Sequence, residues 1–446
     1  MTAAPAAPAA PAAPAPGVRC AIPDTPLAAA AAGLDACVHC GFCMQACPTY
    51  LALGDENDSP RGRLVLMRSL LEGDVAPTDT ALATHIDQCL GCRACESACP
   101  SGVPYGELLE ATRATINAKS SDGIPRVARL ILGVFARPAL MAFSMFLARI
   151  TRALGIARLF AHLPGRAGFA SAMLASTASD QRRSAYPASD ATRWNAALLT
   201  GCVMEGLFAP TNRATERVLA ANGYRMVPVP AQRCCGALHA HAGDLEGARA
   251  LARANIAAFE RAATDYVVVN AAGCGAMLKG YGHLLHDDPA WSERAAKLAA
   301  RSRDVSELLA ASGPRPASES AAATRVAYDP PCHLLHAQRV AAAPLAALGA
   351  ARVELVPLPD ADQCCGGAGI YNLLHPDVSR AVLDAKLDRI EETKVAVVAT
   401  GNPGCLMQIG AGLLRRGSRV RVAHPVDLLD AAYAAPPPVA DSSAAR

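Results

Sequence analysis

The chain has 446 residues, which suits about three domains, and 52% of them are hydrophobic, enough to form sizeable cores. Its formal net charge of only +3 excludes a general nucleic-acid-binding role, because such proteins carry a strong basic excess. The seventeen cysteines are the feature that most restricts the function.

The first sixteen residues, MTAAPAAPAAPAAPAP, lack the basic start and the run of large apolar residues of a secretory signal. We predict a disordered Ala/Pro tail over residues 1–24 and a second loose tail over 433–446. Cysteines in a chain without a secretory signal favour a reducing compartment. We therefore expect a cytoplasmic protein whose thiols bind metal.

Eight cysteines form two copies of C-x2-C-x2-C-x3-C, each followed by a proline, Pro48 and Pro100, that we expect to end a local helix. This is the bacterial spacing for [4Fe–4S] clusters, in which three thiolates of a run bind one cluster and the fourth binds the other. We assign the first cluster to Cys37, Cys40, Cys43 and Cys99. We assign the second cluster to Cys89, Cys92, Cys95 and Cys47.

The alternative for these runs is a pair of zinc sites in a scaffold protein, but zinc sites usually pair two C-x2-C hooks across a longer gap. The gap between Cys47 and Cys89 is longer than a compact β-type ferredoxin needs. Within that gap, residues 61–73 and 80–90 have helical apolar spacing. We predict an α-helical two-cluster ferredoxin domain over residues 25–122.

Residues 123–190 are predicted to be a basic, apolar helical docking segment. No acidic residue occurs between 123 and 179, and the longest uncharged stretch of its apolar part, 138–148, is too short to cross a bilayer. Apolar helices with arginines suit the surface of an anionic membrane. A buried hairpin packed on a partner subunit or on this chain's own domains fits equally well. The arginines are Arg126, Arg129, Arg137, Arg149, Arg152, Arg158 and Arg166.

Two cysteine-rich domains, 191–320 and 321–432, are predicted from an internal repeat. Four cysteines recur in the same order, at intervals that agree to within one position, and the flanking sequences QRCCGALHAHAG and DQCCGGAGIYNL are similar. Such self-similarity indicates a duplicated domain. The pairs are Cys202 and Cys332, Cys234 and Cys364, Cys235 and Cys365, and Cys274 and Cys405.

Strand-like runs precede these cysteines in both repeats, and helical segments such as 211–223 and 245–262 lie between them. Alternation of this kind predicts a parallel α/β sheet. Ligands of such sheets lie at the carboxyl ends of the strands, so the cysteine loops of each repeat should converge at one edge. The strand-like runs are 196–200, 224–230, 265–270, 325–328, 353–359 and 395–400.

Three roles stay open for these eight cysteines: a further metal cluster, thiol–disulfide chemistry at the adjacent Cys-Cys pair, or a structural remnant. Nearby histidines could activate the thiols. They are His239, His333 and His336.

Residues 37–67, residues 85–110 and the two CCG repeats together resemble the iron–sulfur subunit of bacterial glycolate oxidase over roughly residues 30–432. The segment GDENDSPRGR (54–63) and the sequence CPSGVPYGELL (99–109) favour that member over related subunits of anaerobic glycerol-3-phosphate dehydrogenase, lactate utilisation and heterodisulfide reductase. The resemblance implies an electron-transfer subunit with two [4Fe–4S] clusters. A partner subunit carrying FAD would oxidise glycolate to glyoxylate, and the electrons would pass to a membrane quinone or another acceptor.

The basic apolar segment predicts peripheral contact with the inner face of the cytoplasmic membrane, and the low net charge predicts no nucleic-acid partner. We find no G-x-G-x-x-G motif and no base paired with an arginine for a hydroxy acid, so we expect no catalytic residue for substrate oxidation on this chain. The sequence departs from heterodisulfide reductase, whose CCG domains end in C-x2-C. Here Cys274 is followed by Gly275, Ala276 and Met277, and Cys405 by Leu406, Met407 and Gln408. The missing cysteines argue against the non-cubane cluster of that enzyme.

Overall fold

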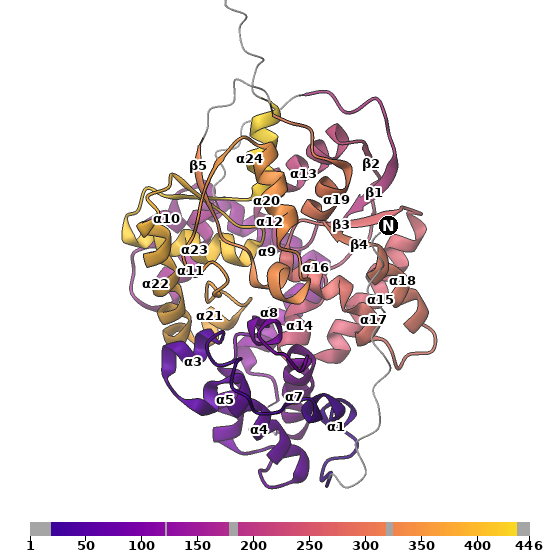
Figure 1. The fold of residues 1–446 in the computed structure, drawn as a ribbon, viewed down its shortest axis with the longest axis vertical. Coiled ribbons are helices and arrows are strands. Elements are labelled where there is room, and N and C mark those ends of the chain that lie inside the picture. The colour runs from indigo at the N-terminus through magenta and orange to yellow at the C-terminus, as the bar shows by residue number, and fades with distance from the viewer. Residues whose placement is uncertain (1–18, 121–122, 178–185, 318–323, 435–446) are drawn as a thin grey trace, which may run out of the picture. The chain divides into compact units, whose positions relative to one another are not determined.

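The computed structural model describes residues 19–120, 123–177, 186–317 and 324–434. The chain divides into two compact units (Figure 1). One comprises the residues up to Pro125 together with His241–Asp244, and the other comprises Arg126–Ala240 and Leu245 onward. The predicted boundaries at 122, 190 and 320 stay predictions, although the first lies close to this division.

The first unit is helical, and its described residues contain no strand. Met67, Leu70, Ile86 and Leu108 are fully buried in its core. The predicted helices at 61–73 and 80–90 are confirmed, and so is the α-helical type of the ferredoxin domain. The elements are α1 (Pro26–Ala29), α2 (Ala32–Asp35), α3 (Pro48–Leu53), η1 (Glu56–Asp58), α4 (Pro60–Glu72), α5 (Thr80–Asp87), α6 (Ala94–Ser97) and α7 (Tyr105–Lys119).

The N-terminal tail is ordered earlier than predicted. Residues 1–18 lie outside the described residues, but Cys20 and Ile22 are partly buried against the core of the first unit. The Ala21 amide also donates a hydrogen bond to the Leu71 carbonyl. The predicted disordered stretch 1–24 therefore extends too far, because the apolar side chains after the Ala/Pro repeat find a hydrophobic surface to pack on.

The second unit begins with four helices: α8 (Arg126–Ala136), α9 (Pro138–Ala153), α10 (Ile156–Phe160) and α11 (Gly165–Ser176). Among the described residues, no single helix is long and apolar enough to cross a membrane. Helices α8 and α9 reach that length and apolarity only as a pair, and they are bent by 103° at the break between them.

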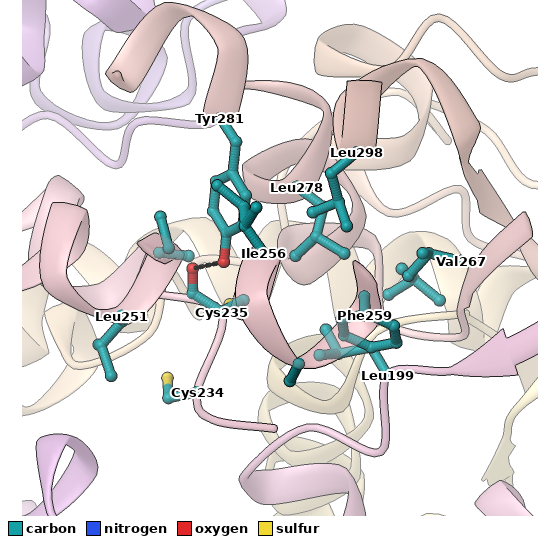
Figure 2. Close-up of a cluster of buried hydrophobic side chains, with 14 of the residues drawn as sticks. Leu199, Cys234, Cys235, Leu251, Ile256, Phe259, Val267, Leu278, Tyr281 and Leu298 are labelled. Atoms are coloured by element: carbon teal, nitrogen blue, oxygen red, sulfur yellow. Dashed lines mark hydrogen bonds between the residues drawn. The ribbon is translucent and has the colours of Figure 1, made fainter. Parts of the chain in front are cut away.

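The first cysteine-rich repeat contains a parallel four-stranded sheet in the order β2-β1-β3-β4. Its strands are β1 (Trp194–Leu198), β2 (Tyr224–Met226), β3 (Tyr266–Val269) and β4 (Ser302–Asp304). The helices around it are α12 (Val203–Leu207), α13 (Ala209–Ala221), α14 (Ala237–His241), α15 (Leu245–Arg261), α16 (Ala272–Lys279), α17 (Tyr281–Leu284), α18 (Ser292–Arg301) and α19 (Val305–Ser312). Figure 2 shows its core, where Ile256, Phe259 and Val267 are fully buried.

The sheet of the second repeat has the order β6-β5-β7-β8, which is the order of the first sheet when the strands of each repeat are counted from its own start. It is also fully parallel. The structure thus confirms the duplicated α/β fold. Strands β4 and β8 were not predicted, because each is only three residues long and neither precedes one of the repeated cysteines that marked the other strands. The elements are β5 (Arg325–Tyr328), η2 (His333–Ala337), α20 (Ala342–Ala350), β6 (Glu354–Val356), α21 (Tyr371–Leu374), α22 (Pro376–Glu392), β7 (Val397–Ala399), α23 (Pro403–Arg416), β8 (Arg421–Ala423) and α24 (Pro425–Tyr433).

The two repeats are joined by polar contacts. The Arg217 guanidinium pairs with the Asp430 carboxylate at 2.7 Å. His424, which caps the N-terminus of α24, accepts a hydrogen bond from the Val426 amide at Nδ1 and donates one from Nε2 to the Asn270 carbonyl at 2.9 Å. Burial lowers the pKa of His424 to about 4, so the imidazole is neutral at physiological pH.

His424 should make the contact between the repeats sensitive to acid. The folded pKa lies below the unfolded value of 6.5, so its contribution is complete above pH 6.5 and is lost as the pH falls toward 4. The loss should reach about 3 kcal/mol of unfolding free energy, at 1.36 kcal/mol per pKa unit. We expect His424→Asn, which keeps a capping side chain, to remove this dependence in urea titrations. Burial raises the pKa of Asp304 to about 6, an effect of opposite sign, so variant and wild type must be compared at each pH.

Candidate iron–sulfur and cysteine-rich sites

The two cysteine runs lie in loops around short helices of the first unit. The run from Cys37 to Cys47 links α2 to α3, and the second run surrounds α6. Pro48 occupies the first position of α3 and therefore begins a helix, so the expectation that this proline ends one is wrong. Proline is favoured there because the first helical residue needs no amide donor.

One cavity brings cysteines of both runs together. Cys99, from the second run, lines it alongside three cysteines of the first run. Cys95 and Tyr105 also line this cavity, and Arg61 lies at it. The three cysteines of the first run are Cys37, Cys40 and Cys43.

Cys47 of the first run lies instead within the electrostatic reach of the second run. Burial raises the pKa of the Cys47 thiol, the Arg63 guanidinium opposes that rise, and the negative charge of Cys89 adds to it. Burial likewise raises the pKa of Cys95 well above its usual value, and Cys89 and Cys47 contribute to the rise. Cys92 is buried as well.

Arg63 is the charged residue of this region that our sequence analysis did not single out. Its side chain is fully buried and forms an ion pair with the Asp58 carboxylate at 3.0 Å. It also donates a hydrogen bond to the Asp58 carbonyl. Its guanidinium also donates to Thr49 Oγ1 at 3.0 Å and to the His85 carbonyl at 2.6 Å. Thr49 Oγ1 lies 3.2 Å from Cys47 Sγ. The segment 54–63 therefore lies against Cys47 at one end of the cysteine site. Its PRGR sequence was the signal from which Arg63 could have been singled out.

The four cysteines of the first repeat form one connected group at the carboxyl ends of β1, β2 and β3, as predicted. The Sγ atoms of Cys202 and Cys234 are 3.7 Å apart. Cys235 is hydrogen-bonded to both Cys234 and Cys274, and these bonds, with burial, raise its pKa well above the usual value. Hydrogen bonds from Cys202 and Cys235 lower the pKa of Cys234, and nearby His239 lowers it slightly further.

Neighbouring side chains hold this group by its backbone. Tyr281 donates its hydroxyl to the Cys235 carbonyl at 2.7 Å (Figure 2), and Asn255 donates to the Cys234 carbonyl at 3.0 Å. Both residues are fully buried. The cysteine loop is thereby fixed against the core of its own repeat.

The second repeat places its cysteines at the corresponding edge. Cys365 is hydrogen-bonded to Cys364 and Cys405, and Cys332 follows β5 at the start of η2. His336 Nε2 lies 3.1 Å from the Asp362 carbonyl oxygen, so this ring is engaged by the backbone.

The surroundings of the second group differ from those of the first, because Asp329 and Lys386 form a buried ion pair at 3.0 Å. Asp329 precedes Cys332 by the same interval by which Leu199 precedes Cys202. Aligned in the same way on the Cys-Cys pairs, Lys386 corresponds to Ile256. Leu199 and Ile256 are both buried apolar residues, so the first repeat has no charge at either position.

Known protein families match both parts of the chain. Residues 33–103 match the 4Fe-4S dicluster domain, and residues 196–279 and 326–410 each match the cysteine-rich CCG domain. The fold, the two cysteine runs and these matches define an iron–sulfur electron-transfer protein with a duplicated CCG domain. Iron–sulfur clusters, rather than zinc, are therefore the metal groups of the cysteine runs.

Similar proteins specify the family. The probable glycolate oxidase iron-sulfur subunit of Bacillus subtilis (strain 168) is 37% identical over 418 residues, covering 88% of this chain and 92% of that protein. The glycolate oxidase iron-sulfur subunit of Escherichia coli (strain K12) is 34% identical, covering 90% and 94%. Lactate utilization protein A of Geobacillus kaustophilus is 32% identical but covers only 52% of this chain. The chain belongs to the family of glycolate oxidase iron–sulfur subunits.

Proposed function

We propose that this chain receives electrons from an FAD-containing partner subunit that oxidises glycolate to glyoxylate, and passes them toward a membrane quinone or another acceptor. The observation that carries this proposal is one pocket lined by Cys99 of the second run together with three cysteines of the first, so that both runs contribute thiols to one small helical unit. The names of the two full-length relatives support glycolate as the substrate. Substrate oxidation is assigned to the partner chain.

The proposed ligands of the first cluster are Cys37, Cys40, Cys43 and Cys99, and those of the second are Cys89, Cys92, Cys95 and Cys47. The shared cavity supports the first set. The second set rests on the spacing of the two runs, and burial of Cys47, Cys89, Cys92 and Cys95 fits it. The donor chemistry also fits. Burial disfavours a free thiolate and so raises the pKa of a buried thiol. Binding to iron removes the proton and stabilises the buried thiolate.

When bound, the two clusters supply one-electron steps that split the two electrons of a reduced flavin. This chain's own residues bury the sulfur atoms, exclude water and fix the surrounding charge. Arg61 lies at the first site, where it pairs with Glu56 and remains partly exposed. Arg63 lies at the second site and is fully buried. The two sites are thus electrostatically different.

The experiment that tests the substrate uses the purified complex of this chain and its flavoprotein partner. Glycolate, lactate or glycerol-3-phosphate is added without oxygen, and bleaching of the cluster absorbance is followed. We expect rapid bleaching with glycolate and little with the other two. Bleaching by lactate alone would instead identify a sister complex, for which the lactate-utilisation relative is the precedent.

A second candidate function, thiol–disulfide reduction by the CCG repeats, is favoured by one observation, the 3.7 Å separation of the Cys202 and Cys234 Sγ atoms. Cys234→Ala separates the two functions. Under this alternative, the variant loses disulfide turnover and keeps its ferredoxin clusters. A variant with undiminished disulfide turnover removes the alternative.

A further inference from the structure

Helices α8 to α10 expose an unusual concentration of large apolar side chains. In the described part of the chain, nineteen large hydrophobic residues are exposed, and twelve of them lie between Val127 and Leu163. Leu130 and Leu159 are 72% and 76% exposed. The others are Val127, Leu140, Phe143, Phe146, Leu147, Ile150, Leu154, Ile156, Phe160 and Leu163. A patch of this size marks an interaction surface.

The exposed apolar residues of α9 lie on the face opposite to its packed face. Met141 is buried, Met145 lies against Gly206, and Arg152 donates to the carbonyls of Thr177 and Leu207. These residues repeat at helical spacing and hold α9 on the second unit. Phe143, Phe146, Leu147, Ile150 and Leu154 follow the same spacing on the outer face. The outward face of α9 therefore exposes a row of apolar side chains that a binding partner would remove from water.

The charges of the segment that carries this patch are all of one sign. No acidic residue occurs from 123 to 179, while exposed arginines alternate with the apolar side chains. Neither α8 nor α9 is long enough to span a bilayer alone, and the pair is bent by 103°, so the two short helices can lie along its surface. The exposed arginines include Arg126, Arg137, Arg149, Arg158 and Arg166.

We propose that the surface formed by α8, α9 and α10 docks on an anionic lipid bilayer. Its apolar side chains enter the interfacial zone, and its arginines pair with the anionic headgroups. A protein partner would need a specific surface that is apolar and carries only acidic charges. An anionic leaflet offers apolar chains and negative headgroups over its whole surface. The proposal does not depend on the substrate proposed above.

The test uses the full chain with its clusters, mixed with vesicles of phosphatidylcholine alone or with an equal amount of phosphatidylglycerol, followed by sedimentation. We expect binding to the phosphatidylglycerol vesicles, weakened by salt. Phe143→Glu/Leu147→Glu should reduce that binding at least tenfold, and Arg149→Gln/Arg158→Gln should reduce it less. Leu345→Glu, at an exposed apolar residue of α20, is the matched control and should bind like the wild type.

Two results would overturn the proposal. One is wild-type protein that stays in the supernatant with both kinds of vesicle. The other is a double glutamate variant that still binds the vesicles but has lost self-association or the flavoprotein partner, measured by light scattering. In that second case the surface is a protein interface.

A second inference rests on the Arg63 network and on the proposed ligand sets. Arg63 donates to Thr49 Oγ1, and that hydroxyl lies 3.2 Å from Cys47 Sγ. Both Arg63 and Arg61 pair with a carboxylate, Asp58 and Glu56 respectively. The Arg63 pair is buried, whereas the Arg61 pair is partly exposed, so water and salt screen its field more strongly.

We propose that Arg63 and Thr49 raise the reduction potential of the cluster held by the Cys47 set above that of the other cluster. A buried positive charge stabilises the reduced cluster, which is the more negative form. The single proton of the Thr49 hydroxyl is donated to the Asp58 carbonyl at 3.0 Å, but a charged sulfur 3.2 Å away competes for it, and a bond to the sulfur acts in the same direction. Electrons would then collect on this cluster. Arg63 and Thr49 are positioning residues, since they act through the cysteine.

The test is an EPR-monitored redox titration in a Cys40→Ser background, where only the Cys47-set cluster should remain. Arg63→Met should shift its reduction equilibrium at least tenfold toward the oxidised form, equivalent to 59 mV for one electron. Arg63→Lys should recover most of the shift, and Arg61→Gln should have little effect. Thr49→Val, nearly isosteric, should shift it in the same direction even if Arg63→Met fails to fold. An unchanged potential in Thr49→Val, or an equal shift in Arg63→Lys and Arg63→Met, would overturn the proposal.

Discussion

Cys92→Ser should remove one cluster and stop electron transfer from glycolate to a quinone analogue, while glycolate still reduces the flavin of the partner subunit. Cys92 is buried in the middle of the second run, so no solvent ligand can readily replace its thiolate. Iron should fall from about eight to about four per chain. The measurements are iron content, flavin reduction in stopped flow, and steady-state quinone reduction.

Cys20→Ser is the control for this substitution. Cys20 is also partly buried in the same unit but lies outside both runs, so its loss should leave iron content and quinone reduction unchanged. Normal quinone reduction by Cys92→Ser would contradict the proposed path, because electrons would then bypass the second cluster. Loss of flavin reduction in the partner would show that the substitution disturbs the complex rather than the electron path.

Asp329→Leu should destabilise the second unit by about 3–5 kcal/mol, because it leaves the Lys386 ammonium buried without its partner. Burial alone lowers the pKa of Lys386, but the Asp329 carboxylate more than offsets this and raises the pKa overall. Without that carboxylate, Lys386 must lose its proton or the structure must open. Urea unfolding followed by tryptophan fluorescence measures the effect, since both tryptophans, Trp194 and Trp291, belong to the second unit.

The first repeat supplies the matched control for this pair. The double variant Asp329→Leu/Lys386→Ile installs the residues found at the corresponding positions, Leu199 and Ile256, and removes both charges at once. We expect it to recover most of the lost stability, because replacing a whole buried ion pair by apolar residues is often neutral. A double variant as unstable as Asp329→Leu would show that the lysine has a structural role beyond neutralising Asp329, such as its bonds to the Asp360 and Ala361 carbonyls.

The sequence predicted the fold well where periodicity was strong. Strand-like apolar runs that alternate with helical segments located β1, β3, β5 and β7. The matching intervals between the two sets of cysteines predicted two domains of the same fold. It could not predict β4 and β8, which contain residues such as Ser302, Arg303 and Arg421 and are strands only through pairing with β3 and β7. Tertiary pairing overrode local preference there.

The candidate site was predicted from cysteine spacing, but its electrostatics were not. Spacing predicted that Cys47 and Cys99 change places between the runs. Cys99 does line one pocket with three cysteines of the first run, while the transfer of Cys47 to the second run stays a prediction. Burial of Arg63 depends on the turn of the segment 54–63 around Cys47, which no local pattern encodes. For the same reason, the ion pair of Asp329 and Lys386, which are far apart in the sequence, could not be predicted.

The most direct test of the central claim is anaerobic purification of the chain, with iron and sulfide counts and EPR of the reduced protein. The proposed function predicts about eight irons and eight sulfides per chain and the signals of two interacting [4Fe–4S]⁺ clusters. Iron well above eight would place a further cluster in the CCG repeats and lengthen the electron path. Little iron with stoichiometric zinc, or a single isolated cluster signal, would contradict the assignment of two clusters to the two runs.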